Sequence, residues 1–473
     1  MEPSGFLVNG EWRLTDRIRP VVNPFDRSVA GEVCQASSKD IDDAIQSAVA
    51  VFQVTRKLQP YQRSEILSFI ASEVDKNKEK FAQLITSETG KPIVFSRAEV
   101  ERSIFTFTYA SEEAKRLEGT VLPLNLASNS DDRFGIVRRF PLGPIAAITP
   151  FNFPLNLVAH KLAPAIATGN PVVLKPSSNA PLTSLMLAEV VARSPLPGGA
   201  LNVVPCSAGE SNQLVTDERI KLITFTGSPA VGWDIKNRAG KKRVVLELGG
   251  NAAAIVDKGV NLDSVVKRVA QGAYGNAGQS CIAVQRVYAH QDIYEEFEEK
   301  FVKISRSMPV GNPTNPRIVV GPMISEEAAA NAKAWIDEAV QGGARVLCGG
   351  SRNGAILEPT VLVDVEPNMR VNCEEVFAPV VTLRKFVDIA GAIRMVNQSR
   401  FGLQAGIFSN DLQAVLRAYN DLEVGGLIVN DYPTYRIDHM PYGGVKDSGF
   451  GREGVRYAME EMTELKLLAI NAM

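Results

Sequence analysis

The chain has 473 residues, of which 45% are hydrophobic and 22% charged, and its formal net charge at pH 7 is −2. This balance is typical of a globular protein with two or three domains, and it excludes the basic surface expected of a nucleic-acid-binding protein. The longest apolar runs are short and interrupted, so we expect no contact with a membrane. The polar start MEPSGFLVNGEWR predicts no export signal and therefore a cytoplasmic protein.

The chain contains three histidines and five scattered cysteines, which are Cys34, Cys206, Cys281, Cys348 and Cys373. None of them forms a CxxC pair or a Cys/His cluster, so we expect neither a disulfide framework nor a metal site. Cys281 differs from the others because it ends the small and polar segment YGNAGQSC and precedes an apolar run. By its residues alone, this cysteine is either a nucleophile or a buried structural thiol.

The first part of the chain favours helices and a hairpin. Residues 61–89 place apolar side chains at helical spacing with charges between them, and a second helix is expected over 96–117. Residues 119–139 are polar and predict a hairpin or arm with a turn at 129–132.

From residue 143 the pattern predicts buried parallel strands. Short apolar runs alternate with helix-length segments in GPIAAITP, NPVVLKP, LNVVP, KLITFTG and RVVLELGG. This alternation is typical of an open α/β sheet built from βαβ units. A second series over 252–450, which includes AAAIV, CIAVQRVYAH, ARVLCGG, PVVTLRKF, LQAGIFS and GGLIVND, predicts a second α/β domain. The segment TELKLLAI is expected to form a closing strand that pairs with the 119–139 arm.

Two strand ends suit a nucleotide. Gly227 and Ser228 follow the run LITFT and precede a helix whose backbone N–H groups suit a pyrophosphate. Lys175 ends the run VVLK, where its ammonium suits a ribose or a phosphate. A plain strand–turn–helix and a solvated lysine explain these residues equally well.

Two further positions suit chemistry. Glu247 ends a predicted strand in ELGG, where a carboxylate serves either as a cap or as an acid/base group. Asn152 in ITPFNFP either donates to an oxyanion or caps a turn.

Taken together, the motifs ITPFNFP, LKPSS, FTGS, ELGGN, GQSC, EEVFAP and PYGGVKDSGFGRE occur in an order that resembles the aldehyde dehydrogenase superfamily. The resemblance extends from VNGEW to TELK, and the pattern is similar to that of lactaldehyde and phosphonoacetaldehyde dehydrogenases. It implies an aldehyde dehydrogenase-like fold of class α/β, with two open α/β domains and a β arm.

The resemblance also implies domain boundaries and an assembly. A Rossmann-like nucleotide-binding domain is expected over 1–118 and 142–246, and a catalytic domain over 247–450. Residues 119–141 and 451–473 are expected to form an oligomerisation arm with its C-terminal strand. Members of the superfamily with this arm are homodimers or homotetramers.

The resemblance assigns roles to four residues. The Cys281 thiolate attacks the aldehyde to give a thiohemiacetal, and Asn152 holds the oxyanion together with the backbone N–H of the cysteine. After hydride transfer to the nicotinamide, water activated by Glu247 hydrolyses the remaining thioester. Lys161 matches a lysine in a proton path near that glutamate. We expect the small residues before Cys281 to allow close approach of substrate and cofactor.

The cofactor is expected to be NADP or NAD. The residues that match cofactor contacts are Thr149, Pro150, Phe151, Lys175, Ser178, Gly227, Ser228, Val231, Glu375 and Phe377. Many NAD-preferring members have a glutamate in place of Ser178, which repels a 2′-phosphate. Serine removes this repulsion, so NADP should be tolerated or preferred.

The substrate positions implied by the resemblance are Arg102, His160, Arg436, Ser280 and Ile282. Three of them are potentially cationic, although His160 carries a charge only if a partner raises its pKa. An arginine fork suits a carboxylate, a phosphate or a phosphonate. We therefore expect a short polar, anionic aldehyde of the phosphonoacetaldehyde, lactaldehyde or glyceraldehyde-3-phosphate type, and Ser280 weakens the last candidate.

Three alternatives stay open at this point. Arg102 and Arg436 would be purely structural if they formed ion pairs with Glu99, Glu101 or Asp438. A CoA-acylating semialdehyde dehydrogenase usually lacks the ELGG glutamate, which is present here as Glu247. A non-catalytic cofactor-binding homologue typically loses the cysteine or the asparagine, and both are kept in this chain.

Overall fold

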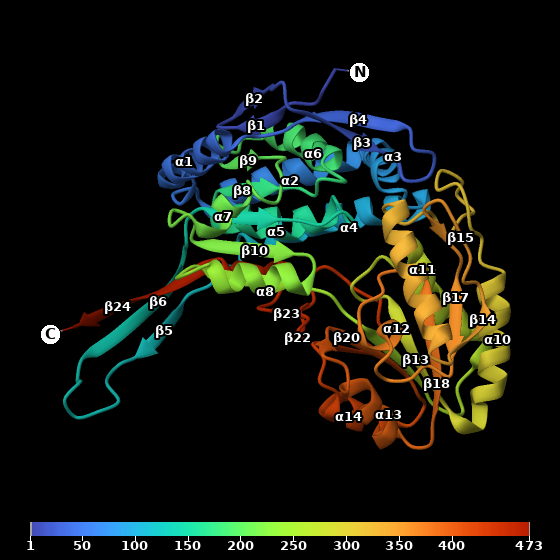
Figure 1. Cartoon of the computed structure of the whole chain (residues 1–473). Helices are drawn as coiled ribbons and strands as arrows, with labels where there is room; N and C mark the ends of the chain where they lie inside the picture. The colour runs from blue at the N-terminus through green and yellow to red at the C-terminus, as the bar shows by residue number, and fades with distance from the viewer. Residues whose placement is uncertain (1, 473) are drawn as a thin grey trace.

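The computed structural model describes residues 2–472 and arranges them as two α/β units with a projecting β arm (Figure 1). The first sheet has the strand order β2-β1-β9-β8-β7-β10-β11-β23. Strands β7 to β11 are mutually parallel and coincide with the five predicted apolar runs. The eight strands are β1 (Phe6–Val8), β2 (Glu11–Arg13), β7 (Ile145–Ile148), β8 (Val172–Lys175), β9 (Leu201–Val203), β10 (Leu222–Thr226), β11 (Arg243–Glu247) and β23 (Gly449–Phe450).

The direction of strand addition reverses beside β7. Strands β8 and β9 follow on one side of it, whereas β10 and β11 lie on the other. In open α/β sheets, ligands bind beyond the carboxyl ends of the strands at such a reversal. The segments that follow β7 and β10 therefore lie at the preferred ligand position, and they contain Asn152 and Gly227 respectively.

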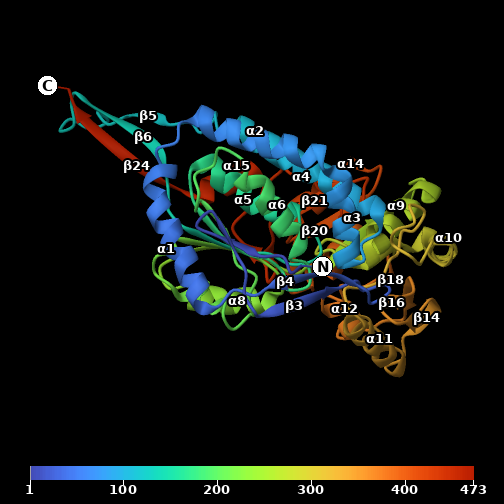
Figure 2. The ribbon, with the colours of Figure 1, turned by 90° about the horizontal axis from the view of Figure 1, so that it is seen from above.

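Helices surround this first sheet. The apolar pattern over 61–89 forms two helices, α2 and α3, that meet at Asn77. Seen from above, α2 and α4 run side by side along one flank (Figure 2). The helices of this unit are α1 (Ser38–Thr55), α2 (Pro60–Lys76), α3 (Lys78–Thr89), α4 (Ile93–Glu113), α5 (Asn156–Thr168), α6 (Leu182–Ala192), α7 (Asn212–Thr216), α8 (Pro229–Arg238) and α15 (Val455–Glu461).

A buried carboxylate fixes the start of α5. The N-cap residue Leu155 has no acceptor side chain, so the first N–H groups of the helix need a partner from elsewhere. Glu99 on α4 accepts hydrogen bonds from the backbone N–H groups of Leu155 (2.9 Å) and Asn156 (3.1 Å). Its other oxygen pairs with the buried ammonium of Lys91. This anchor positions a helix that carries His160 and Lys161.

The second sheet has the order β14-β17-β18-β13-β12-β20-β21, and only the β14–β17 pair is antiparallel. Its strands are β12 (Ala252–Val256), β13 (Val284–His290), β14 (Arg345–Cys348), β17 (Thr360–Val363), β18 (Val380–Phe386), β20 (Gln404–Phe408) and β21 (Gly426–Val429). Its helices are α9 (Leu262–Tyr274), α10 (Tyr294–Arg306), α11 (Glu326–Gln341), α12 (Arg370–Cys373), α13 (Ile389–Asn397) and α14 (Leu412–Asp421). The second predicted series therefore forms a second α/β unit.

The chain passes between the two units twice. It leaves the first sheet after β11 and enters β12 through residues 248–251. It returns at β23, which pairs antiparallel with β11, and α15 then packs against α4 and α5. Residues 449–461 thus pack with the first unit, which the sequence pattern did not indicate because their pairing partners lie about two hundred residues away.

Short strands complete the fold. Two pairs, β3 (Ile18–Val22) with β4 (Val29–Cys34) and β15 (Arg352–Asn353) with β16 (Ile356–Leu357), are antiparallel hairpins. A third antiparallel pair joins β19 (Phe401–Gly402) to β22 (Val445–Lys446).

The arm is a three-stranded antiparallel sheet of β5 (Thr120–Pro123), β6 (Arg133–Pro141) and β24 (Thr463–Asn471). The pairing of β24 with β6 runs from Thr463 opposite Pro141 to Asn471 opposite Arg133, which confirms the predicted partnership. The arm extends away from both units, with the end of the chain at its tip (Figures 1 and 2).

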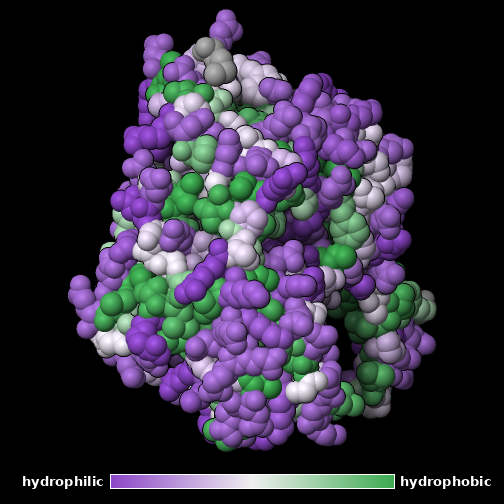
Figure 3. Space-filling view, turned by 90° about the vertical axis from the view of Figure 1, so that its right-hand side faces the viewer, coloured by the Kyte–Doolittle hydropathy of each residue, from purple (hydrophilic) through white to green (hydrophobic). Residues whose placement is uncertain are grey.

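Hydrophilic side chains predominate on the face drawn in Figure 3, where the apolar residues form smaller patches between them. Within residues 2–472, no helix combines the length and the apolar character needed to cross a bilayer.

We predict that Glu99→Ala destabilises the fold. The substitution removes the acceptor at the start of α5 and leaves the Lys91 ammonium buried without its partner, which should lower the free energy of unfolding by about 3–5 kcal/mol. Urea unfolding followed by circular dichroism measures the change. The control is Glu101→Ala on the same helix, whose exposed carboxylate contributes less than about 0.5 kcal/mol. Equal stability of the two variants would contradict the anchoring role of Glu99.

Candidate active site

A cavity of about 360 Å³ lies where the carboxyl edge of the first sheet meets the second unit. It brings together most of the residues that the sequence singled out. The predicted residues that line it are Arg102, Pro150, Phe151, Asn152, Gly227, Ser228, Glu247, Ser280, Cys281, Ile282, Glu375, Phe377 and Arg436. The remaining predicted residues lie outside its walls, as described below.

Two glycines let three motifs meet. A Cβ on Gly250 would lie 2.0 Å from the Cys281 carbonyl oxygen, and a Cβ on Gly249 would lie 2.3 Å from Glu375 Oε2. Neither position has room for a side chain. The ELGG backbone therefore packs directly on the cysteine segment and on the Glu375 carboxylate, which accepts a hydrogen bond from Gly250 N–H (2.9 Å).

The small residues before Cys281 have a different role from the one expected. They lie in the buried turn η1 (Gly275–Gly278), in which Asn276 and Ala277 both adopt φ of 54°. A Cβ on Gly278, whose φ is 68°, would lie 2.2 Å from the Ala378 carbonyl oxygen. These residues allow tight packing of the turn against the second unit. Only Ser280, Cys281 and Ile282 of this segment reach the cavity.

The Cys281 thiol is partly exposed to the cavity and has one neighbouring hydroxyl. Its Sγ lies 3.1 Å from the Tyr442 Oη. Burial raises the pKa of the thiol to about 12, and the nearby carboxylates of Glu375 and Glu247 add to this effect. The resting thiol is therefore protonated at neutral pH.

Glu247 is almost completely buried, and neither of its carboxylate oxygens has a hydrogen-bond partner among the described residues. Burial, together with the negative charge of Glu453, raises its pKa well above 4.5. Lys161 donates to Glu453 (3.0 Å) and to Thr224 (2.9 Å). Lys161 thus reaches the site through Glu453 and does not line the cavity.

Asn152 follows β7, and its side-chain amide points to the cysteine segment. It donates to the Gln279 carbonyl (3.1 Å), two residues before Cys281. An amide nitrogen has two N–H groups. The second N–H is available to a ligand oxygen next to the thiol.

The mouth of the cavity suits a dinucleotide. Ser228 caps α8, so the free N–H groups of the first helical turn stand beside Gly227 and suit a phosphate. The rings of Phe151 and Phe377 meet edge to face at 6.0 Å. Burial raises the pKa of Glu375 to about 7, and its carboxylate faces the same space. Donors, a carboxylate acceptor and aromatic walls thus fit phosphates, a ribose and a planar ring.

Four predicted cofactor residues lie farther along this edge. Thr149 donates its backbone N–H to the Lys175 carbonyl (3.2 Å), which ties the ends of β7 and β8 together. Burial lowers the pKa of Lys175, whose ammonium donates to the Pro176 carbonyl (3.1 Å). Ser178 is half-buried beside the next loop, and Val231 is 49% exposed on α8.

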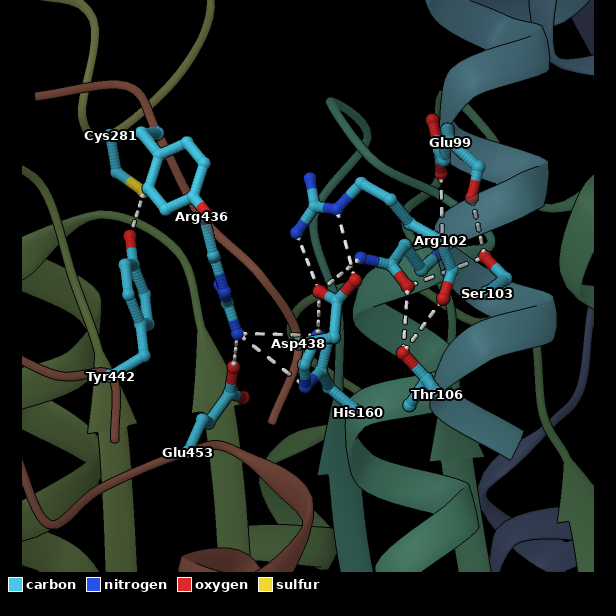
Figure 4. Close-up of polar contacts among 12 residues, drawn as sticks. Glu99, Arg102, Ser103, Thr106, His160, Cys281, Arg436, Asp438, Tyr442 and Glu453 are labelled. Carbon is cyan, nitrogen blue, oxygen red and sulfur yellow. Dashed lines mark hydrogen bonds and ion pairs between the residues drawn. The ribbon is translucent and has the colours of Figure 1, made fainter. Parts of the chain in front are cut away.

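A network of buried charges forms the inner wall (Figure 4). Arg102 binds Asp438 through Nε (3.1 Å) and Nη2 (2.6 Å). Arg436 donates to Glu453 (3.1 Å) and lies over the Tyr442 ring, 3.6 Å from its centroid. The pairing of Arg102 with Asp438 agrees with one of the structural alternatives, yet both arginines still line the cavity.

His160 does not fit the expectation of a cationic tunnel residue. It is fully buried behind Arg436, and its Nε2 lies 2.7 Å from Asp438 Oδ1. Burial and the neighbouring Arg436 lower its pKa, whereas the hydrogen bond to Asp438 and the charge of that carboxylate oppose this shift. The sequence could not show this, because it does not reveal which groups surround the ring.

Sequence reasoning assigned no role to Glu453 or Tyr442, and it considered Asp438 only as a structural ion-pair partner of the arginines. Burial raises the pKa of Glu453, but Lys161, His160 and Arg436 outweigh this effect and hold it at about 2. All three residues lie in or beside the quoted motif PYGGVKDSGFGRE. The presence of a carboxylate and a tyrosine among the glycines of this motif could have indicated a functional role. An exposed loop often has the same composition, so the motif alone did not distinguish the two.

Comparison with known proteins agrees with this geometry. Residues 12–468 match the model of the aldehyde dehydrogenase family. A 3-sulfolactaldehyde dehydrogenase of Priestia aryabhattai is 43% identical over 99% of this chain and 98% of its own length.

Two solved structures are similar over almost the whole chain. The aldehyde dehydrogenase 21 of Physcomitrella patens, in complex with the reaction product succinate, is 45% identical with a TM-score of 0.98, and the match covers 100% of this chain and 99% of that one. A glyceraldehyde-3-phosphate dehydrogenase of Methanocaldococcus jannaschii, complexed with NADP, is 38% identical with a TM-score of 0.92 over 97% and 100% of the two chains. The predicted fold class and superfamily are thereby confirmed.

We predict that alkylation of Cys281 in the ligand-free protein accelerates steadily with pH. Only the thiolate reacts, and a pKa of about 12 means that its fraction rises about tenfold per pH unit over the whole practical range. Iodoacetamide labelling, followed by mass spectrometry of the Cys281 peptide, gives the rates, with Cys281→Ser as the control. A plateau at or below pH 9.0, the ordinary value for a thiol, would show that the buried environment does not suppress ionisation.

Proposed function

The chain belongs to the aldehyde dehydrogenase family, and we propose that this enzyme oxidises short anionic aldehydes to the corresponding acids. It is an NAD(P)-dependent aldehyde dehydrogenase. One observation carries the proposal about the substrate. The side chain of Arg436 is 7% exposed and lines the cavity that holds Cys281, and its Nε has no hydrogen-bond partner among the described residues.

The proposed chemistry uses Cys281, Asn152 and Glu247. The Cys281 thiol loses its proton to water in the cavity, and the sulfur attacks the aldehyde carbon. The free amide N–H of Asn152 stabilises the oxygen that becomes negative. When bound, the nicotinamide of the cofactor accepts the hydride that leaves this carbon. Glu247 takes a proton from the water that hydrolyses the thioester, and its raised pKa makes it a stronger base than an exposed carboxylate. Acid and free thiol are released.

Anion binding is supported by the charges around the cavity. The two arginines that line the cavity, Arg102 and Arg436, pair with Asp438 and Glu453. Glu247 and Glu375 also line it, but burial raises the pKa of both carboxyl groups and so reduces the negative charge that they present to an anion. Burial lowers the pKa of Arg436, but the neighbouring Tyr442, Glu453 and Asp438 raise it by more than burial lowers it. The guanidinium therefore stays charged. Its Nε is buried without a hydrogen-bond partner among the described residues, and we propose that a carboxylate or sulfonate of the substrate supplies the missing acceptor.

The relatives act on substrates of this kind. One is named for 3-sulfolactaldehyde, and another was solved with succinate as its reaction product. A sulfonate and a carboxylate are both compact anions that an arginine holds by hydrogen bonds. We therefore propose that the substrate is an aldehyde of about three or four carbons, similar in size to the compounds named for those relatives. It carries an acidic group at the end remote from the carbonyl.

NADP is the proposed preferred cofactor. Ser178 carries no charge to repel a 2′-phosphate, and it shares a surface pocket with Arg19. The Arg19 guanidinium lies 3.5 Å from Asn179 Oδ1, and no carboxylate within the described chain forms an ion pair with it. An exposed cation beside an uncharged serine favours a phosphate over a bare hydroxyl.

The arm supports assembly into homodimers or homotetramers. Its large apolar side chains are exposed to solvent, which is typical of a protein–protein interface. They are Val121, Leu122, Phe134, Leu465, Leu467 and Leu468. A second copy of the chain would cover them. A cytoplasmic location remains a prediction from composition.

We predict a strong preference for charged aldehydes. The panel is succinate semialdehyde, 3-sulfolactaldehyde, phosphonoacetaldehyde, lactaldehyde and propanal, each with NAD and with NADP, and absorbance of the reduced cofactor gives the rates. Arg436→Leu and Arg102→Met should each raise KM for the charged members by about tenfold to a hundredfold, because a hydrogen bond to a charged group contributes about 1.5–3 kcal/mol. KM for propanal should not change.

Arg97→Met on the same helix as Arg102 is the matched control, since Arg97 is half exposed and pairs with Glu79 outside the cavity. Equal losses on charged and uncharged aldehydes would mean that the arginines are structural. Product analysis with added CoA completes the test, because acyl-CoA in place of free acid would exclude hydrolytic chemistry.

We also predict that Ser178→Glu reverses the cofactor preference. The new carboxylate would stand at the proposed 2′-phosphate position, so NADP affinity should fall by about tenfold or more through like-charge repulsion, whereas NAD affinity should hold or improve. Fluorescence titration of the aldehyde-free enzyme with each cofactor measures both dissociation constants. A parallel fall for NAD and NADP would mean that Ser178 does not face the 2′ position.

A further inference from the structure

The Tyr442 hydroxyl lies within hydrogen-bond distance of the reactive sulfur, at 3.1 Å from Cys281 Sγ (Figure 4). We propose that Tyr442 donates a hydrogen bond to the Cys281 thiolate, and that it thereby orients the nucleophile and favours its ionised form. The inference rests on the proposed role of Cys281 as nucleophile. It adds a residue that had no assigned part in the reaction.

The direction of this hydrogen bond follows from the chemistry of sulfur. A thiol can donate to the phenol oxygen or accept from it, so the resting contact is ambiguous. A thiolate has no proton to donate and can only accept. Once Cys281 ionises, the Tyr442 O–H must be the donor, and a hydrogen bond to an ionised acceptor is about twice as strong as a neutral one.

The phenol is held rigidly. Tyr442 is 3% exposed, and its backbone pairs with that of Glu453 in both directions, at 3.0 Å and 2.7 Å. The Glu453 carboxylate holds Arg436, and Arg436 in turn lies over the Tyr442 ring. This closed set of contacts leaves the hydroxyl little freedom to turn away from the sulfur.

The cation over the ring also strengthens the donor. The Arg436 guanidinium carbon lies 3.6 Å from the ring centroid, where a positive charge withdraws electron density from the phenol. The other charged groups around the sulfur, Glu247 and Glu375, are carboxylates, and both oppose a thiolate when ionised. Tyr442 and Arg436 are therefore the groups on this wall that favour ionisation of Cys281.

The test compares thiol reactivity in wild type and Tyr442→Phe, with no aldehyde and no cofactor present. Phenylalanine keeps the ring and its stacking on Arg436 and removes only the hydroxyl. The second-order rate of iodoacetamide alkylation at Cys281, measured across a pH series, should fall about tenfold, because one charge-assisted hydrogen bond shifts the thiol pKa upward by about one unit. Tyr419→Phe, at a 71% exposed tyrosine, is the matched control and should leave the rate unchanged.

A second measurement does not depend on the folding of Tyr442→Phe. Replacing the sulfur in Cys281→Ala removes the acceptor, so the near-ultraviolet absorbance of one buried tyrosine should shift relative to wild type. An unchanged spectrum would mean that the hydroxyl makes no hydrogen bond to the sulfur.

Unchanged or faster alkylation in folded Tyr442→Phe would overturn the inference, since it would mean that the hydroxyl only restrains a thiol. Retained NADP affinity in this variant separates thiol activation from a general loss of structure. Because alkylation involves no aldehyde, a failure of the anionic-substrate proposal would leave this result intact. If the enzyme prefers charged aldehydes but Tyr442→Phe alkylates at Cys281 as fast as wild type, only the proposed role of Tyr442 is wrong.

Discussion

The active site depends on a close backbone crossing at Gly249 and Gly250. There the chain leaves the first sheet, passes within van der Waals distance of the Cys281 carbonyl, and enters the second sheet. A single methyl group at either glycine would collide with Cys281 or Glu375. The crossing therefore fixes the distance between the carboxyl edge of one sheet and the segment before β13, and the cavity lies in the space that it leaves.

Buried charges give this cavity its chemical character. Each carboxylate on the inner wall holds several groups at once: Asp438 binds Arg102, His160 and the Asn156 amide, and Glu453 binds Lys161 and Arg436. Ion pairing and ligand binding are often treated as alternatives for an arginine. Here the carboxylates orient the guanidinium groups, and the Nε of Arg436 is left without a hydrogen-bond partner among the described residues. Pairing makes these cations ordered enough to recognise an anion without an additional entropic cost.

The environment of Cys281 acts on the ionisation of the nucleophile in both directions. Burial and two carboxylates disfavour the Cys281 thiolate, while Tyr442 and Arg436 favour it. A thiol that stays protonated at rest is protected from adventitious oxidation and alkylation. Reactivity is then governed by Tyr442, which contacts the sulfur, and by Arg436, which lies over the Tyr442 ring and also lines the cavity proposed to hold the substrate anion.

The sequence by itself determined the strands, the arm and the motifs around Cys281, Glu247 and Asn152, because apolar runs, turns and short motifs are encoded by neighbouring residues. It predicted the pairing of TELKLLAI with the arm, which both segments signal by their composition. Only the tertiary structure decided that His160 is buried against Asp438, that Lys161 binds Glu453, and that Tyr442 contacts the sulfur. A pKa and a hydrogen bond depend on partners more than a hundred residues away, and no local pattern records which of them come together.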